Sequence, residues 1–126
     1  MLFVADLVSN VSSPRVAPMP DLDTDTAVHY AIYGGNELQK LVLLNLEYFG
    51  GGSSRPSRVF GAARQLGTRL KVRRLTGASS AATRGVTWAG QSVDGNGVVV
   101  GDLKAEIVED GEVRLGASEA VIVERA

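Results

Sequence analysis

Hydrophobic and polar residues alternate with a period of two along much of the chain, which is the pattern of half-buried β-strands. The alternation is clearest at residues 28–32. A tight-turn sequence at 34–36, Gly-Gly-Asn, follows it, and residues 40–46 then form a nearly continuous apolar run. These features predict a β-hairpin whose second strand is buried on both faces.

Shorter strand signals, separated by glycine-rich turns, occupy the rest of the chain. Prolines at 14, 18 and 20 restrict residues 15–18 to an edge strand. Residues 105–108 and 113–115 are expected to pair as a second hairpin, whereas the stretch from 50 to 67 has no clear pattern. Further strands are predicted at 70–75, 86–88, 98–100 and 120–123. About seven short strands joined by glycine turns predict an all-β fold, an antiparallel β-sandwich.

A short N-terminal helix is predicted before the first strand. Its apolar residues fall at roughly helical spacing and are Leu2, Phe3, Leu7 and Val8. A helix this short is marginal alone, so its apolar face needs a partner. The start of the sequence has neither the basic region nor the cleavage motif of a signal peptide. If Met1 is the true start, the expected location is the cytoplasm.

The amino-acid composition excludes several kinds of disulfide, metal and catalytic site. The 126 residues suit one domain, and the absence of cysteine excludes disulfides, thiolate metal sites and cysteine nucleophiles. A single histidine excludes a multi-histidine metal site within one chain. The formal net charge of −1 gives no general indication of nucleic-acid or membrane binding, and we expect neither as a partner.

Candidate sites in the individual motifs are weak. His29 lies within an alternating strand pattern and no nucleophile-elbow motif is present, so a structural role is favoured over a catalytic triad. The Asp-x-Asp-x-Asp run at 21–25 resembles the start of a calcium loop, but Thr26 and Ile32 stand where glycine and glutamate are required. Only a weak surface cation site remains open there. The glycines at 50–52 and 95–101 do not match phosphate-binding fingerprints, so no cofactor is predicted.

One feature has a genuine functional alternative. Seven basic residues without an acidic residue between them, here called the basic block, are Arg55, Arg58, Arg64, Arg69, Lys71, Arg73 and Arg74. They could contact an anionic polymer such as an acidic polysaccharide. The favoured interpretation is a solvated sheet face that pairs with the acidic C-terminal strands, because Lys71 and Arg73 fall on one face.

Several segments, in this order and spacing, resemble one known domain. They are Arg74-Leu75-Thr76-Gly77-Ala78, residues 85–94 (GVTWAGQSVD), Gly111-Glu112-Val113-Arg114-Leu115, residues 118–123 (SEAVIV), Tyr30-Ala31-Ile32-Tyr33, residues 41–46 (LVLLNL) and residues 2–6 (LFVAD). Together they resemble the C-terminal β domain of glycoside hydrolase family 79, a family that includes β-glucuronidases and heparanase.

The resemblance implies a Greek-key sandwich that packs against a (β/α)₈ barrel, in the same polypeptide or in a separate one. The family's two catalytic glutamates lie on that barrel, so no catalytic residue is assigned here and the chain is expected to be inactive alone. Residues 1–14 would be the remnant of the last barrel helix and a linker, with the four apolar helix residues facing the barrel, and residues 15–126 the sandwich.

The same resemblance implies that the chain is a fragment or truncated product of a larger enzyme. Family members are usually secreted, which makes an extracellular location the expectation for a full-length relative. The family's sandwich also includes chain from before the barrel, and an unfilled position would leave a sheet edge open. Two alternatives remain: a stand-alone module that binds acidic polysaccharide through residues 55–74, and an enzyme that uses unrecognised acidic residues.

Overall fold

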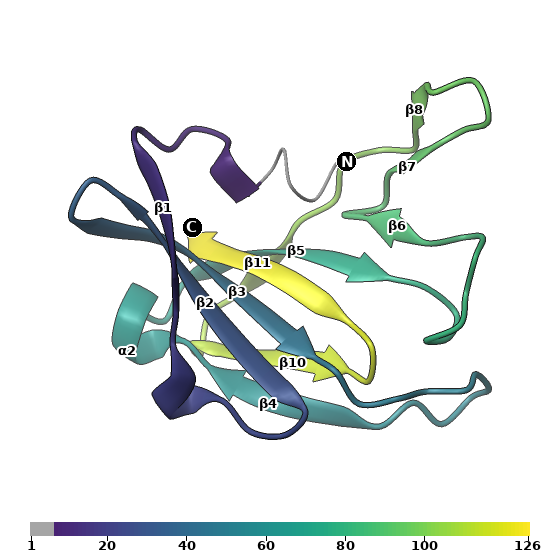
Figure 1. Ribbon diagram of the computed structural model, residues 1–126, viewed down its shortest axis with the longest axis horizontal. Coiled ribbons are helices and arrows are strands. Elements are labelled where there is room, and N and C mark those ends of the chain that lie inside the picture. Colours follow the sequence, from purple (N-terminus) through teal and green to yellow (C-terminus); the bar gives the residue numbers. More distant parts are fainter. Residues whose placement is uncertain (1–6) are drawn as a thin grey trace.

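The computed structural model describes residues 7–126, in which antiparallel β-strands dominate (Figure 1). The short helical segments that lie wholly in this range are the 3₁₀ turn η1 (Pro20–Leu22) and α2 (Ala63–Leu66), and Leu7 and Val8 are also helical. The strands in chain order are β1 (Pro14–Pro18), β2 (Ala27–Gly34), β3 (Glu37–Asn45), β4 (Ser57–Gly61), β5 (Leu70–Thr76), β6 (Thr87–Trp88), β7 (Ser92–Val93), β8 (Val99–Val100), β9 (Glu106–Val108), β10 (Glu112–Gly116) and β11 (Ala120–Arg125).

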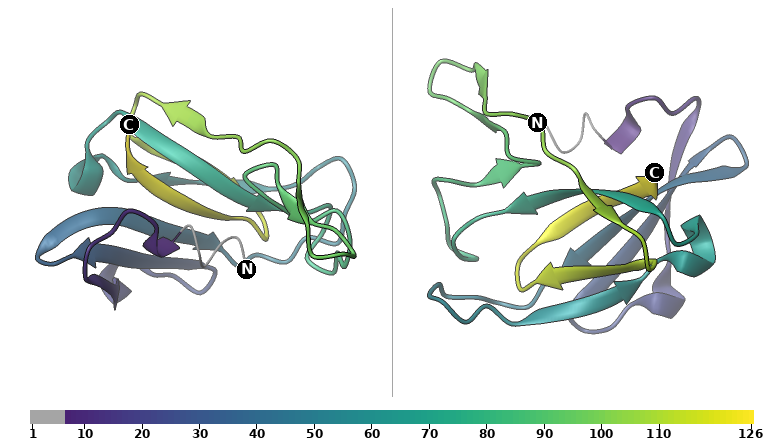
Figure 2. Two further views of the ribbon diagram at one scale, coloured as in Figure 1. Left: turned by 90° about the horizontal axis from the view of Figure 1, so that it is seen from above. Right: turned by 180° about the vertical axis from the view of Figure 1, so that it is seen from behind.

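Most strands belong to one large sheet in the order β1-β2-β3-β11-β5-β6, and β9 also pairs with β5. The last strand of the chain, β11, therefore lies in the middle of the sheet, between β3 and β5. Strands β10 and β4 form a second, two-stranded sheet, and β7 pairs with β8 in a separate hairpin. Both views of Figure 2 place the segment that carries β6–β8 at one end of the molecule and α2 at the other. The predicted all-β antiparallel sandwich is confirmed.

The main core lies between the two sheets. Strand periodicity turns alternate residues of the large sheet inward, for example Leu41, Leu43, Val121 and Val123. The small sheet covers them with Phe60, Val113 and Leu115, and Ala62 and Leu66 close the end near α2. Each of these side chains is at most 4% exposed.

The opposite face of the large sheet, here called the outer face, carries a second apolar cluster. The residues that alternate with the core positions, Ile32, Val42 and Ile122, pack there with Trp88 and Ala89. Leu7 and Val11 of the N-terminal segment pack against this cluster. Burial on both faces explains the continuous apolar run at 40–46 and confirms the predicted hairpin of β2 and β3.

The expected second hairpin of residues 105–108 and 113–115 is wrong. β9 pairs with β5 in the large sheet, whereas β10 pairs with β4 in the small one. The intervening residues cross from one sheet to the other instead of reversing within one. Gly111 adopts a φ of +71°, and an added Cβ there would lie 2.4 Å from the Cβ of Ala63. This glycine therefore permits close packing on α2 and is not a hairpin-turn residue.

The N-terminal half contains one confirmed and one missed element. The predicted edge strand at 15–18 is β1, which pairs with β2 at the border of the large sheet. The stretch from 50 to 67, which showed no pattern, contains both β4 and α2. Of the predicted N-terminal helix, Leu7 and Val8 are helical, while Leu2 and Phe3 lie outside the described residues.

Candidate functional site

Four cations of the basic block pair with acidic side chains of the C-terminal segment. Arg73 Nη1 lies 2.9 Å from Glu124 Oε1, and Arg69 Nε lies 3.4 Å from Glu109 Oε1. The Arg69–Glu109 pair is solvent-exposed, but the Arg73 side chain is only 6% exposed. The expectation of a solvated face is therefore wrong for Arg73, because Arg73 lies beside Ile122 of β11, which belongs to the buried apolar cluster of the outer face.

Arg55 and Arg74 converge on Glu119. Arg74 donates from Nη1 to Glu119 Oε1 at 2.9 Å and from Nε to Glu106 Oε2 at 2.9 Å. Arg55 Nη1 lies 3.5 Å from the other oxygen of Glu119, and the Arg55 guanidinium stacks on the Phe49 ring at 4.5 Å. These cations tie the loop after β3 and strand β5 to the turn before β11, so their role is to hold the sandwich together.

Opposing effects set the pKa values of Arg74 and Glu119. Burial alone would lower the pKa of Arg74, but hydrogen bonds and charge from Glu106 and Glu119 outweigh it and raise that pKa. Burial alone would raise the pKa of Glu119. Donation from the Thr76 hydroxyl, the Gly116 N–H and Arg74 outweighs the burial and lowers it. Both shifts keep the two side chains in their charged forms.

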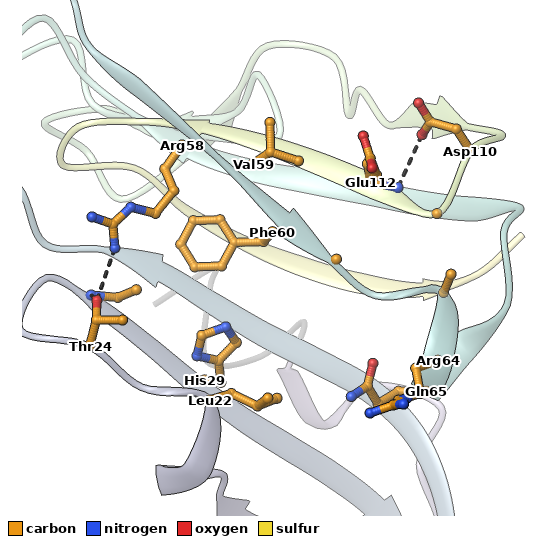
Figure 3. Close-up of a pocket in the computed structure, with 14 residues that line it drawn as sticks. Leu22, Thr24, His29, Arg58, Val59, Phe60, Arg64, Gln65, Asp110 and Glu112 are labelled. Carbon is orange, nitrogen blue, oxygen red and sulfur yellow. Dashed lines mark hydrogen bonds between the residues drawn. The ribbon is translucent and has the colours of Figure 1, made fainter.

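Arg58 and Arg64 differ from these four, because neither has a carboxylate partner among residues 7–126. Both line one open cleft, here called the β2–β4 cleft, which has a volume of about 490 Å³ (Figure 3). Lys71, the remaining cation, lies on β5 away from this cleft. The structure therefore separates the basic block instead of presenting it as one positive surface.

The β2–β4 cleft has an apolar floor with charged walls. His29 and Phe60 lie on the floor, with ring centroids 5.3 Å apart and exposures of 9% and 4%. Arg58 enters from β4 and donates to Thr24 Oγ1 at 2.9 Å. The other polar walls of the cleft are formed by Arg64, Gln65, Asp110 and Glu112.

The loop acid Asp23 fixes His29. Its Oδ1 accepts the His29 backbone N–H at 2.8 Å and lies 3.0 Å from His29 Nδ1. A histidine oriented by an aspartate is part of a hydrolytic triad, but the hydroxyl in the cleft, that of Thr24, accepts bonds from Ala27 N–H and Arg58. Within residues 7–126 the His29 side chain makes no hydrogen bond to a serine or threonine hydroxyl. The geometry suits binding better than nucleophilic catalysis.

A second depression, here called the outer-face groove, has an apolar rim. It has a volume of about 420 Å³ and lies where β3 and β5 end and β11 begins. Leu46 and Tyr48 at its rim are 56% and 72% exposed, and Val86 is 40% exposed. Leu44, Leu75 and Ala120 continue the apolar lining toward the outer-face cluster. Exposed apolar side chains grouped around one depression make it a candidate contact site.

The comparisons with known proteins agree with this architecture. A family model described as the glycosyl hydrolase family 79 C-terminal beta domain matches residues 29–122. The chain belongs to this family. Among solved structures, the chain is similar to a 4-O-α-L-rhamnosyl-β-D-glucuronidase from Fusarium oxysporum 12S, at 30% identity and a TM-score of 0.74. No curated protein matches the chain.

The family 79 resemblance noted in the sequence is thereby confirmed. The Fusarium match covers 86% of this chain but only 25% of the enzyme, so the chain spans about a quarter of that enzyme's length. No helix within residues 7–126 has the length and hydropathy to cross a lipid bilayer. In the same range, no three His, Asp or Glu side chains gather as metal ligands.

Both sites contain residues that sequence reasoning missed. Asp23 was seen only as one of three loop acids, and Gln65 and Glu112 carried no motif. Gln65 and Glu112 line the same cleft as His29 because α2, β4 and β10 pack over β2, an arrangement that no local pattern reports. For the outer-face groove, the consecutive even-numbered apolar residues 42, 44, 46 and 48 were a usable signal, since they continue one strand face beyond the end of β3.

Proposed function

We propose that this chain is a non-catalytic β domain that packs against the catalytic domain of a family 79 glycoside hydrolase and stabilises it. The catalytic domain is part of the same polypeptide or of a separate one. The outer-face groove carries the proposal, because it leaves Leu46 and Tyr48 largely exposed beside an otherwise buried apolar cluster. Burying such side chains contributes about 1.5–3 kcal/mol each.

The position of the N-terminal segment supports this choice of partner. Leu7 and Val11 lie on the outer face, and the Lys40 ammonium donates to Ser9 O at 2.9 Å, which ties the segment to β3. In a family C-terminal domain, the rest of the enzyme precedes this segment. The three quarters of the Fusarium enzyme that the chain does not match would then connect on the face that carries the groove.

The small, two-stranded sheet supports the proposal that the catalytic polypeptide contributes a further strand to this domain. Among the described residues, β10 and β4 pair only with each other in that sheet, and sheets of two strands are marginal. Open strand edges favour the addition of a further strand. Chain from the catalytic polypeptide that pairs along β4 or β10 would remove the open edge, as the family resemblance implies.

The test is a chimera in which this chain replaces the matching segment of the Fusarium glucuronidase. Leu46→Asp places a charge in the groove, and Leu103→Asp is the matched control, since Leu103 is 61% exposed and lies outside the groove and outside β4 and β10. We expect Leu46→Asp to lower the temperature at which the chimera loses half its activity, and Leu103→Asp to leave it unchanged. In the isolated chain both variants should change the free energy of unfolding by less than about 1 kcal/mol.

Amide hydrogen exchange gives a second readout. Residues 44–48 should gain protection in the chimera relative to the isolated chain, whereas residues around Leu103 should not. Equal effects of Leu46→Asp and Leu103→Asp in the chimera, with no added protection at 44–48, would rule out the groove as the contact. The isolated chain should not hydrolyse an aryl β-glucuronide that the chimera hydrolyses.

A further inference from the structure

The segment before β1 contains the sequence Asn10-Val11-Ser12, which the docking proposal does not use. An asparagine followed two positions later by serine or threonine, with any residue except proline between them, is the acceptor signal for N-linked glycosylation. At the other asparagines of the chain, Asn36, Asn45 and Asn96, neither serine nor threonine stands two positions later. One acceptor signal is therefore present, and its use depends on how the fold presents it.

The fold turns both ends of this signal toward solvent. Asn10 and Ser12 are exposed, whereas Val11 between them packs against the apolar cluster of the outer face. Neither the Asn10 carboxamide nor the Ser12 hydroxyl forms a hydrogen bond within residues 7–126. The two groups that define the signal are thus accessible and are not used to hold the fold together.

The backbone of the segment forms an anchored turn. The Val11 N–H donates to Val8 O at 3.4 Å, and Asn10 adopts a φ of +58°, which asparagine tolerates better than most residues. The Lys40 ammonium holds the turn by donating to Ser9 O at 2.9 Å. A left-handed turn alone would favour glycine at position 10 and would require nothing of Ser12, so the exposed serine is a separate feature.

The signal lies apart from the outer-face groove. A Cβ added at Gly34 would lie 3.2 Å from Ser12 O, so the segment packs beside the turn between β2 and β3. The groove is at the other end of β3, where Leu46 lines it. About 20 Å of extended chain separates Leu46 from Lys40, which holds the segment. A group attached to Asn10 is therefore at the end of β3 opposite to the groove.

We propose that Asn10 is the acceptor of an N-linked glycan when the chain passes through a secretory pathway. The donor is an oligosaccharide linked to a lipid diphosphate. A bond forms between Asn10 Nδ2 and the anomeric carbon of the first sugar, and the bond from that carbon to the diphosphate oxygen breaks. The amide nitrogen gives one proton to a base of the transferase, the lipid diphosphate leaves, and the Ser12 hydroxyl positions the acceptor on the transferase.

The test is secretion of the chain from a eukaryotic host behind a cleavable leader, followed by measurement of the intact mass. We expect most of the wild-type chain to carry one glycan, and its removal by a peptide amidase should convert Asn10 to aspartate in the mapped peptide. Asn10→Gln removes the acceptor and Ser12→Ala removes the hydroxyl, so both variants should lose the glycan. Ser12→Thr keeps a hydroxyl and should keep the glycan.

Ser13→Ala is the matched control, since Ser13 is exposed beside the signal but does not belong to it, and this variant should keep the glycan. The same variants in the secreted chimera with the Fusarium glucuronidase give a second measurement that does not require the isolated chain to fold. A wild-type chain secreted without a glycan in both forms, or a glycan that persists in Ser12→Ala, would overturn the proposal. Neither outcome affects docking through the outer-face groove, which Leu46→Asp tests separately.

Discussion

Replacing Glu119 by glutamine probes the ion-pair network that links three parts of the sandwich. The carboxylate accepts from Gly116 N–H at 2.7 Å, from Thr76 Oγ1 at 2.7 Å and from Arg74 Nη1 at 2.9 Å. It is also 3.5 Å from Arg55 Nη1. The variant Glu119→Gln keeps the shape of the side chain, removes its charge and turns one acceptor oxygen into a donor.

The expected cost follows from the bonds that change. Hydrogen bonds to a charged group contribute about 1.5–3 kcal/mol and neutral ones about 0.5–1.5, so weakening two or three of them costs roughly 2–3 kcal/mol. Arg74 retains its bonds to Glu106, which keeps the loss below that of a fully orphaned cation. For a chain of this size the melting temperature should fall by roughly 10 °C.

The direction of the Glu119 pKa shift determines how the stability difference between wild type and Glu119→Gln changes with pH. Because the folded state lowers the pKa of Glu119, its carboxylate stabilises the fold above the ordinary glutamate pKa of about 4.3, and that stabilisation is lost as pH falls through the lower folded value. The difference between wild type and Glu119→Gln should therefore be full at pH 7 and shrink in acid. Urea unfolding followed by fluorescence of Trp88, the single tryptophan, measures it.

Glu109→Gln is the matched control, since the Arg69–Glu109 pair is exposed and contributes about 0–1 kcal/mol. The reasoning is refuted if Glu119→Gln costs no more than Glu109→Gln, or if its cost stays constant from pH 7 to pH 3.

The same unfolding assay checks two further substitutions. Gly111→Ala should cost roughly 2–3 kcal/mol, because its Cβ would meet Ala63 at 2.4 Å in a residue with φ of +71°, whereas Gly61→Ala, with open space around it, should cost less than about 1 kcal/mol. Asn45→Ala should cost roughly 1–3 kcal/mol, because it removes the buried bond from Asn45 Nδ2 to the Leu115 carbonyl at 3.1 Å and the bond that Asn45 Oδ1 accepts from Glu47 N–H at 3.1 Å. Indistinguishable costs for Gly111→Ala and Gly61→Ala would contradict the packing argument.

The local pattern of apolar and polar residues was sufficient to predict strands in which buried residues recur regularly along the sequence. The hairpin of β2 and β3 was predictable because alternation, a glycine turn and an apolar return strand occur within 20 residues. β4 was missed because Phe60 is its only fully buried strand residue, so no alternation is visible around it. The false hairpin of β9 and β10 shows the same limit, since a glycine turn reports a change of direction and not which sheet receives the next strand.

The candidate site was less predictable than the fold, for a related reason. The sequence marked the basic block as a unit, but its functional meaning depends on which cations find carboxylate partners. Arg74 is paired because β11 lies beside β5, which brings Glu119 within reach, whereas Arg58, on β4 of the other sheet, has no carboxylate partner within residues 7–126. Which carboxylate an arginine reaches depends on the order of strands in the sheets, and that order cannot be predicted from residues adjacent in the sequence.

The same order of strands separates the β2–β4 cleft from the outer-face groove. Residues of β2 and β3 that alternate along one strand face opposite sides of the large sheet, so His29 points to the β2–β4 cleft while Leu44 points to the outer-face groove. A catalytic domain docked on the groove would leave the cleft open to solvent.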